Sequence, residues 1–179
     1  MRLSLVPFML AITLFIPAPA GADDPDGSVA AMRKDIAYVQ DCMTKADAAQ
    51  ACATLAAKAC IARVGGKVSY GAVGNCFARE TRIFRQLYRD RVMVGLNWAY
   101  RDDSEELPIL NSDVNRFQTM MATETAWQTY VEAECRMEML HFTNGNASMV
   151  DYPACQSRLY AERIALLDGL AKPQGWIRR

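Results

Sequence analysis

The chain has 179 residues, which is enough for one domain with a hydrophobic core. Its 20 basic residues balance 20 acidic ones, and loss of a leader that contains Arg2 would leave 19 against 20, a net charge of about −1. This balance argues against nucleic-acid binding and against electrostatic docking on anionic membranes.

The first 22 residues have the pattern of a secretory signal peptide. Met1 and Arg2 form a short positive start, and an almost unbroken apolar run covers residues 3–17. Small residues follow at the position that signal peptidase requires, and acidic residues come next. The apolar run is too short to span a bilayer. We therefore expect cleavage after Ala22 and a periplasmic or secreted mature protein without a membrane span.

The cysteines predict a disulfide framework, because an even number in an exported chain favours pairing. The six are Cys42, Cys52, Cys60, Cys76, Cys135 and Cys155. A zinc site is the competing interpretation, but the chain has no C-x-x-C pair and His141 is its only histidine. We expect no metal and no other cofactor.

The N-terminal half of the mature chain has helical periodicity. Between residues 29 and 43 apolar residues recur at intervals of three and four residues, which predicts a first helix. Asp47 has the position of an N-cap for a second, alanine-rich helix that runs through Ala62. Cys42 and Cys52 lie five residues on either side of this cap, so a helical hairpin would pair them.

A glycine-containing segment, 65–71, predicts a loop before the third helix, which we expect from Asn75 to Tyr100. The segment lacks the Gly-Lys-Ser/Thr helix start of a phosphate-binding loop. Cys60 and Cys76 flank it and form the second expected pair.

The core candidates of the third helix are Phe77, Phe84, Leu87, Tyr88, Met93, Leu96 and Tyr100. Its basic residues are Arg79, Arg82, Arg85, Arg89 and Arg91, with Glu80 and Asp90 as expected partners. These arginines predict a face of the third helix that is exposed to solvent. The alternative is that they form a partner-binding surface.

An acidic connection, Arg101–Glu106, precedes the fourth helix, which we expect to be capped by Asn111 or Ser112 and to run to about His141. Its predicted buried residues are Phe117, Met120, Met121, Trp127, Val131 and Cys135, with Trp127 the largest. Pro153 predicts the start of a fifth helix. Its predicted buried residues are Cys155, Leu159, Leu166, Leu167 and Leu170. Cys135 and Cys155 flank the turn between these helices and form the third expected pair.

No catalytic arrangement is evident. His141 has the position of a helix-end residue, and the chain has neither a GxSxG nor an HExxH motif. Arg163 shares the apolar stripe of the fifth helix, where an unpaired charge is costly. Either it extends to solvent, or a fourth-helix acid (Glu124, Glu132 or Glu134) pairs with it. Asn97 is expected to be a buried hydrogen-bonding residue.

Three segments together resemble a known family: LNWAY (96–100), AWQTYVEAEC (126–135) and the C-x3-L-x3-R-x3-L spacing that begins at Cys155. They are similar to the N-terminal domain of LprI-like lysozyme inhibitors, which are small exported bacterial proteins. The cysteine spacing from 42 to 76 resembles a cysteine-rich extension found in some members. The chain departs from the family pattern where Val131 and Glu132 replace an Arg-Asp pair after Tyr130, where Met93 replaces an aspartate, and where Asn144-Gly145-Asn146 replaces a glycine pair.

The helical periodicity and the cysteines predict an all-α, disulfide-stapled bundle of about five helices. The resemblance implies the same all-helical class, with Asn97, Trp127, Tyr130 and Arg163 as structural motif residues. Together with the signal-peptide pattern, it divides the chain into a signal peptide (1–22), a cysteine-rich helical extension (23–75), an LprI-like domain (76–172) and a tail (173–179). It implies a non-enzymatic protein that inhibits a lysozyme. Lysozymes are basic, and an acidic surface raises association rates, so the candidate contacts are Asp102, Asp103, Glu105 and Glu106. The alternative is a non-catalytic module that binds peptidoglycan, the envelope or another protein.

Overall fold

The computed structural model describes residues 29–46, 49–65, 69–105, 115–140 and 148–171. These residues form five α-helices and a short 3-10 helix, with no strand among them. In order they are α1 (Val29–Lys45), η1 (Ala49–Cys52), α2 (Leu55–Val64), α3 (Tyr70–Glu105), α4 (Arg116–Leu140) and α5 (Ser148–Ala171). The all-α prediction is therefore confirmed. The expected signal peptide, His141 and the tail 173–179 lie outside the described residues.

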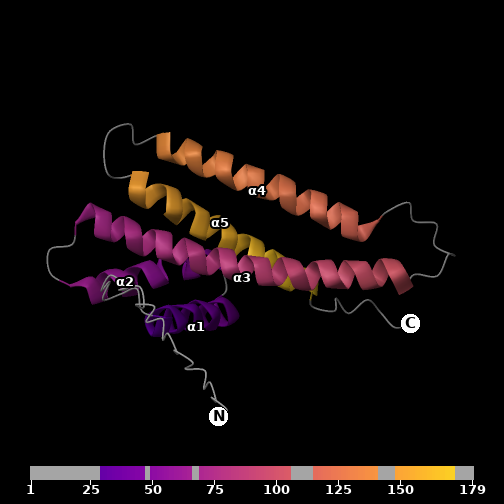
Figure 1. The fold of residues 1–179 in the computed structure, drawn as a ribbon, viewed down its shortest axis with the longest axis horizontal. Helices are drawn as coiled ribbons and strands as arrows, with labels where there is room; N and C mark the ends of the chain where they lie inside the picture. The colour runs from indigo at the N-terminus through magenta and orange to yellow at the C-terminus, as the bar shows by residue number, and fades with distance from the viewer. Residues whose placement is uncertain (1–28, 47–48, 66–68, 106–114, 141–147, 172–179) are drawn as a thin grey trace, which may run out of the picture.

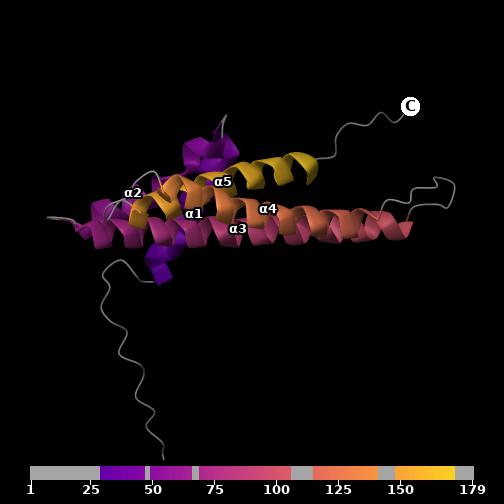
Figure 2. The same cartoon turned by 90° about the horizontal axis from the view of Figure 1, so that it is seen from above.

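Three long helices form the body of the molecule, with the N-terminal elements against one half of it. Helices α3, α4 and α5 run lengthwise, and α1 and α2 lie beside the first half of α3 (Figure 1). Figure 2 shows that α1 crosses the direction of α3. Helix α5 packs against both α3 and α4, and η1 also contacts it. The core lies between these elements, around Phe84, Val131 and Ile164.

All three expected disulfides are present. Cys42–Cys52 joins α1 to η1, Cys60–Cys76 joins α2 to α3, and Cys135–Cys155 joins α4 to α5. Their Cα–Cα separations are 5.7, 5.5 and 5.5 Å, within the range that the bond requires. Each bond therefore fixes two consecutive elements relative to one another.

The second helix is interrupted, contrary to the prediction of one helix from Asp47 through Ala62. The chain forms η1, passes through Thr54 in the left-handed region (φ 77°), and only then begins α2. Glu80 of α3 accepts hydrogen bonds from the backbone N–H groups of Thr54 (2.7 Å) and Ala57 (2.8 Å). It therefore caps a neighbouring helix, which is stabilising because the first N–H groups of a helix lack internal partners.

The sequence predicted that Glu80 would pair with arginines on a solvated face, and this prediction is wrong. Glu80 is fully buried, and this burial raises the pKa of its carboxyl group, although the backbone hydrogen bonds oppose the shift. Arg79, predicted on the solvated face, is also buried and pairs with Asp35 of α1 at 3.0 Å. Two of the expected surface charges therefore connect α3 to the N-terminal elements.

Helix α3 extends beyond the predicted limits of Asn75 and Tyr100 at both ends. The Ser69 hydroxyl accepts a hydrogen bond from the Ala72 N–H at 3.2 Å and caps the earlier start. Residues 101–105 continue the helix rather than forming a connection. Asn115 caps α4, because its side-chain oxygen accepts from the Gln118 N–H at 2.7 Å. The predicted caps, Asn111 and Ser112, lie outside the described residues.

Helix α5 begins at Ser148, so Pro153 lies inside it rather than at its start. Gly74 of α3 explains why an earlier start is favoured. A Cβ atom at Gly74 would lie 3.1 Å from the Met149 Cβ and 3.2 Å from the Met149 carbonyl oxygen. The missing side chain lets the first turn of α5 pack against α3. The Thr81 hydroxyl also donates to the Pro153 carbonyl at 2.8 Å, which holds the two helices together.

Several predicted core positions are exposed. They are Met93, Asn97, Tyr100, Met121, Leu166 and Leu170. For α3 the reason is its length, because the N-terminal elements lie beside its first half only (Figure 1). Trp127 is half-buried, and Phe84 is the largest side chain with full burial. The predictions for Phe84, Leu87, Leu159 and Leu167 are confirmed.

Candidate functional site

Arg163 of α5 forms an ion pair with Glu124 of α4. Its Nε lies 3.2 Å from one Glu124 carboxylate oxygen, and its Nη2 donates to the other. The two side chains are only 12% and 5% exposed. The prediction that a fourth-helix acid pairs with Arg163 is therefore confirmed, and Glu124 is that acid rather than Glu132 or Glu134.

Aromatic residues from three helices surround this ion pair. The Tyr88 hydroxyl of α3 donates to Glu124 at 3.0 Å. The Trp127 ring lies 5.0 Å from the Tyr88 ring and 5.3 Å from the Tyr160 ring, between centroids. The Arg163 guanidinium lies 5.7 Å from the centroid of Trp127, within cation–π range. We call these five residues the Arg163 cluster. Its burial and its spread over α3, α4 and α5 indicate a structural role.

The Arg163 cluster predicts a loss of stability at high pH. Burial, with a smaller contribution from the charge of Glu124, raises the pKa of Tyr88 to about 12 from its ordinary value of 10.0. The folded state favours the neutral hydroxyl, so this contribution is complete below pH 10 and is lost as the pH rises to about 12. The loss should reach about 2–3 kcal/mol in the free energy of unfolding, measured with urea at each pH.

Tyr88→Phe should make that decline shallower, because the titrating hydroxyl is removed. Tyr38→Phe is the control, since Tyr38 is exposed and should leave the pH dependence unchanged. The same slope in the parent protein and in Tyr88→Phe would contradict this account of the cluster.

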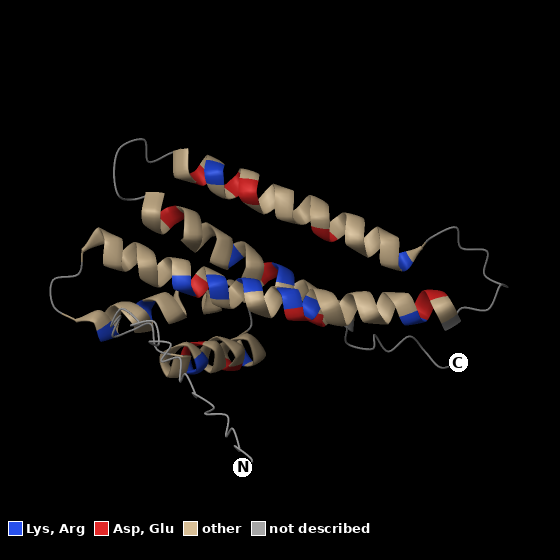
Figure 3. Ribbon diagram, in the orientation of Figure 1, with Lys and Arg blue, Asp and Glu red and all other residues tan. Residues whose placement is uncertain are grey.

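The acidic segment at the end of α3 is partly occupied by structural contacts. The Asp103 carboxylate accepts hydrogen bonds from the backbone N–H groups of Arg116 (3.0 Å) and Phe117 (2.9 Å). The Phe117 hydrogen bond is the main reason that the pKa of Asp103 is lowered. Asp102 pairs with the Arg116 side chain at 3.0 Å. Of the four candidate contacts, these two therefore tie α3 to the start of α4 (Figure 3).

The other two candidate contacts are Glu105 and Glu106. The Glu105 side chain and Glu106 lie outside the described residues. Asp102 remains 44% exposed in its side chain and can still contact a partner. Arg116 pairs with both Asp102 and Asp103, so each of these two negative charges has a cation beside it.

Exposed apolar residues lie on the same helix face as Asp102. Val94 and Trp98 are 53% and 52% exposed, and the spacing of four residues aligns Val94, Trp98 and Asp102 along α3. We call these three residues the α3 end surface. Exposed tryptophan is typical of protein interfaces, where aromatic residues contribute much of the binding energy. Sequence reasoning did not single out Trp98. The signal was present, because Trp98 lies on a different helix face from the core candidate Leu96, which is buried.

Neither metal chemistry nor a membrane span is evident in the part of the chain that the structure describes. No group of His, Cys, Asp and Glu side chains there could hold a metal ion. None of the described helices combines the length and apolar character needed to cross a bilayer. Tyr130, the remaining motif residue, is 50% exposed on α4 and is not part of the Arg163 cluster.

Comparison with known proteins returned no family model, no curated protein and no solved structure that matches the chain.

Proposed function

We propose that this protein is an exported, LprI-like inhibitor of a basic lysozyme. The observation that carries the proposal is the meeting of two of the three resemblance segments. The segment 126–135 contributes Trp127 to the Arg163 cluster and Cys135 to a disulfide. The C-x3-L-x3-R-x3-L segment contributes Cys155 and Arg163 to the same two features. Residues that resemble a family motif and also depend on one another for packing support a shared fold.

The proposed location is the periplasm or the cell exterior. Three disulfides favour an oxidising compartment, since cytosolic thiols are kept reduced. A cleaved signal peptide, with cleavage after Ala22, is part of the proposal.

The α3 end surface is the proposed contact with the lysozyme. Trp98 supplies an exposed aromatic side chain at its centre, and Asp102 supplies a negative charge beside it. An aromatic anchor next to an acid suits a cationic protein partner. Because Arg116 offsets the charge of Asp102, we expect Trp98 to contribute more to affinity than the acidic residues do.

The test compares inhibition of lysozyme by matched aromatic variants of the mature, oxidised protein. Trp98→Ala should raise the inhibition constant about 30-fold or more, the size expected for an interface hot spot. Tyr130→Ala is the control, because Tyr130 is equally exposed but lies on α4. Equal inhibition by the parent protein and Trp98→Ala would exclude this surface. No inhibition by the parent protein would overturn the proposed function.

A further inference from the structure

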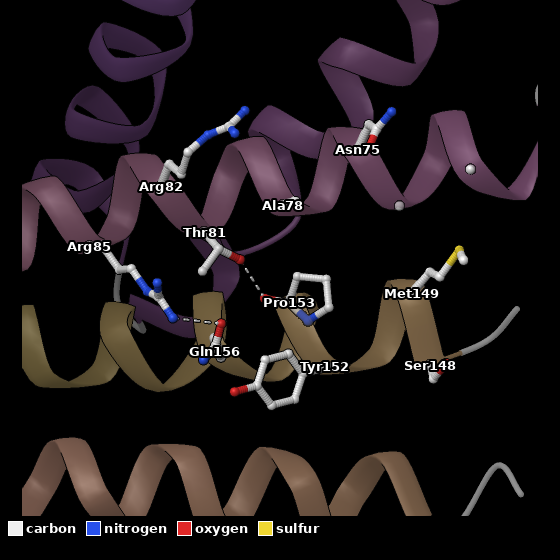
Figure 4. Close-up of a pocket in the computed structure, with 12 residues that line it drawn as sticks. Asn75, Ala78, Thr81, Arg82, Arg85, Ser148, Met149, Tyr152, Pro153 and Gln156 are labelled. Atoms are coloured by element: carbon white, nitrogen blue, oxygen red, sulfur yellow. Dashed lines mark hydrogen bonds between the residues drawn. The ribbon is translucent and has the colours of Figure 1, made fainter.

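A cavity of about 670 Å³ lies between the first halves of α3 and α5. Ala78, Arg82 and Arg85 line it from α3, and Met149, Pro153 and Gln156 line it from α5. Figure 4 shows Arg85 extending from α3 to α5, where its Nη2 donates to the side-chain oxygen of Gln156 at 3.2 Å. The volume is in the range of small-molecule sites.

The described lining of the cavity has positive charge and no compensating acid. Among the described residues that line it, Arg82 and Arg85 are the only charged ones. Arg82 is an exposed lining residue, and no acid among the described residues pairs with it. Arg85 is half-buried, and its partners among the described residues are the neutral Gln156 and the Tyr160 ring, 5.8 Å from its guanidinium carbon.

Arg85 is unusual in this molecule. Every other described arginine that is at least partly buried has a carboxylate partner. These pairs are Arg79–Asp35, Arg91–Asp168, Arg116–Asp102, Arg158–Glu138 and Arg163–Glu124. A partly buried guanidinium without an anion is energetically costly. Arg85 is thus a half-buried positive charge with no carboxylate partner among the described residues, and it lines a cavity.

Two buried N–H donors in the same place also lack acceptors. Gln156 is only 2% exposed, and its side-chain oxygen is held by Arg85. Its Nε2 is buried and has no hydrogen-bond partner among the described residues, and the same is true of the Arg85 Nε. Buried donors without acceptors are rare because each costs free energy. Both would gain from an oxygen-rich ligand that enters with a small movement of these side chains.

We propose that this cavity binds a carboxylate carried on a small, partly apolar molecule. A carboxylate offers two coplanar oxygens, which match the donors of a guanidinium and an adjacent amide. Ala78, Met149 and Pro153 provide an apolar wall for the group next to the carboxylate. A free amino acid and the C-terminal end of a peptide both have this chemistry. The proposal does not depend on lysozyme inhibition, because the cavity lies on the first half of α3 and the α3 end surface on its second half.

The test is calorimetric titration of the oxidised mature protein with four probes. They are N-acetyl-alanyl-alanine, the C-terminal amide of that dipeptide, alanine and inorganic phosphate. We expect the free carboxylate dipeptide to bind with a dissociation constant of about 1 mM or lower, and its amide to bind at least about tenfold more weakly. Tighter binding of the dipeptide than of alanine identifies a peptide end, and the reverse order identifies a free amino acid.

Matched arginine variants locate the site. Arg82→Gln and Arg85→Gln should each weaken dipeptide binding about tenfold. Arg89→Gln is the control, because Arg89 is exposed on the same helix and does not line the cavity. Arg82 is also exposed, so its variant should fold even if Arg85→Gln does not. Absence of binding of both the dipeptide and alanine at about 10 mM would overturn the proposal. Equal binding of acid and amide, tighter binding of phosphate, or equal losses in Arg82→Gln and Arg89→Gln would each overturn it as well.

Discussion

Stepwise reduction should unfold the N-terminal elements before α4 and α5 separate. In the chain-entropy account each disulfide contributes about 3 kcal/mol, so the three together are comparable with the ~5–15 kcal/mol stability of a whole domain. Helix α2, which Cys60–Cys76 joins to α3, buries only small residues, namely Ala56, Ala57 and Cys60. Helices α4 and α5 bury Val131, Leu159 and other larger side chains, which retain more hydrophobic stabilisation after reduction.

Hydrogen exchange read by mass spectrometry during a titration with reductant checks this order. Peptides from α1 and α2 should lose protection at lower reductant concentration than peptides from α4 and α5. The paired variants Cys42→Ser/Cys52→Ser and Cys135→Ser/Cys155→Ser serve as matched controls, since each removes one bond only. Loss of protection in α4 and α5 first would contradict the proposed distribution of stability. Peptide mapping of the unreduced protein checks the three pairs themselves.

Arg163→Ala should lower the free energy of unfolding by about 3 kcal/mol, because it leaves the Glu124 carboxylate buried without its cation. Arg158→Ala is the matched control. Arg158 pairs with Glu138, but both side chains are well exposed, at 40% and 38%, so its loss should cost less than about 1 kcal/mol. Urea unfolding at pH 7 measures both values.

The origin of the effect can be separated by a second substitution. Glu124→Gln in the Arg163→Ala background should recover part of the lost stability, because no unpaired charge is then buried. Equal costs for Arg163→Ala and Arg158→Ala would show that burial adds nothing to the Arg163–Glu124 interaction.

Features set by local spacing could be predicted from the sequence. The disulfide pairs followed because each flanks one inter-helix turn, and turn-flanking positions lie close together. That the partner of Arg163 is an acid on the fourth helix could also be predicted, because a charge on an apolar helix stripe needs a buried counter-charge. The helical period of three to four residues located the turns in the first case and the apolar stripe in the second.

Features that depend on contacts between distant segments could not be predicted from the sequence. Glu80 caps α2 from another helix, and its neighbours in the sequence give no sign of that partner. The early start of α5 depends on the close approach of Gly74, far earlier in the chain. The α3 end surface depends on where the covering elements stop, which a helical pattern alone does not encode. The same holds for the unpaired charge of Arg85, because only the folded chain shows which arginines lack an acid.

The most direct measurement of the central claim is calorimetric titration of the oxidised mature protein into lysozyme. Goose-, chicken- and invertebrate-type enzymes should be tested in parallel. We predict saturable binding to at least one type, with a dissociation constant of about 1 μM or lower and weaker binding as ionic strength rises. The fully reduced protein should not bind. Absence of binding to all three types by the oxidised protein would contradict the proposed function.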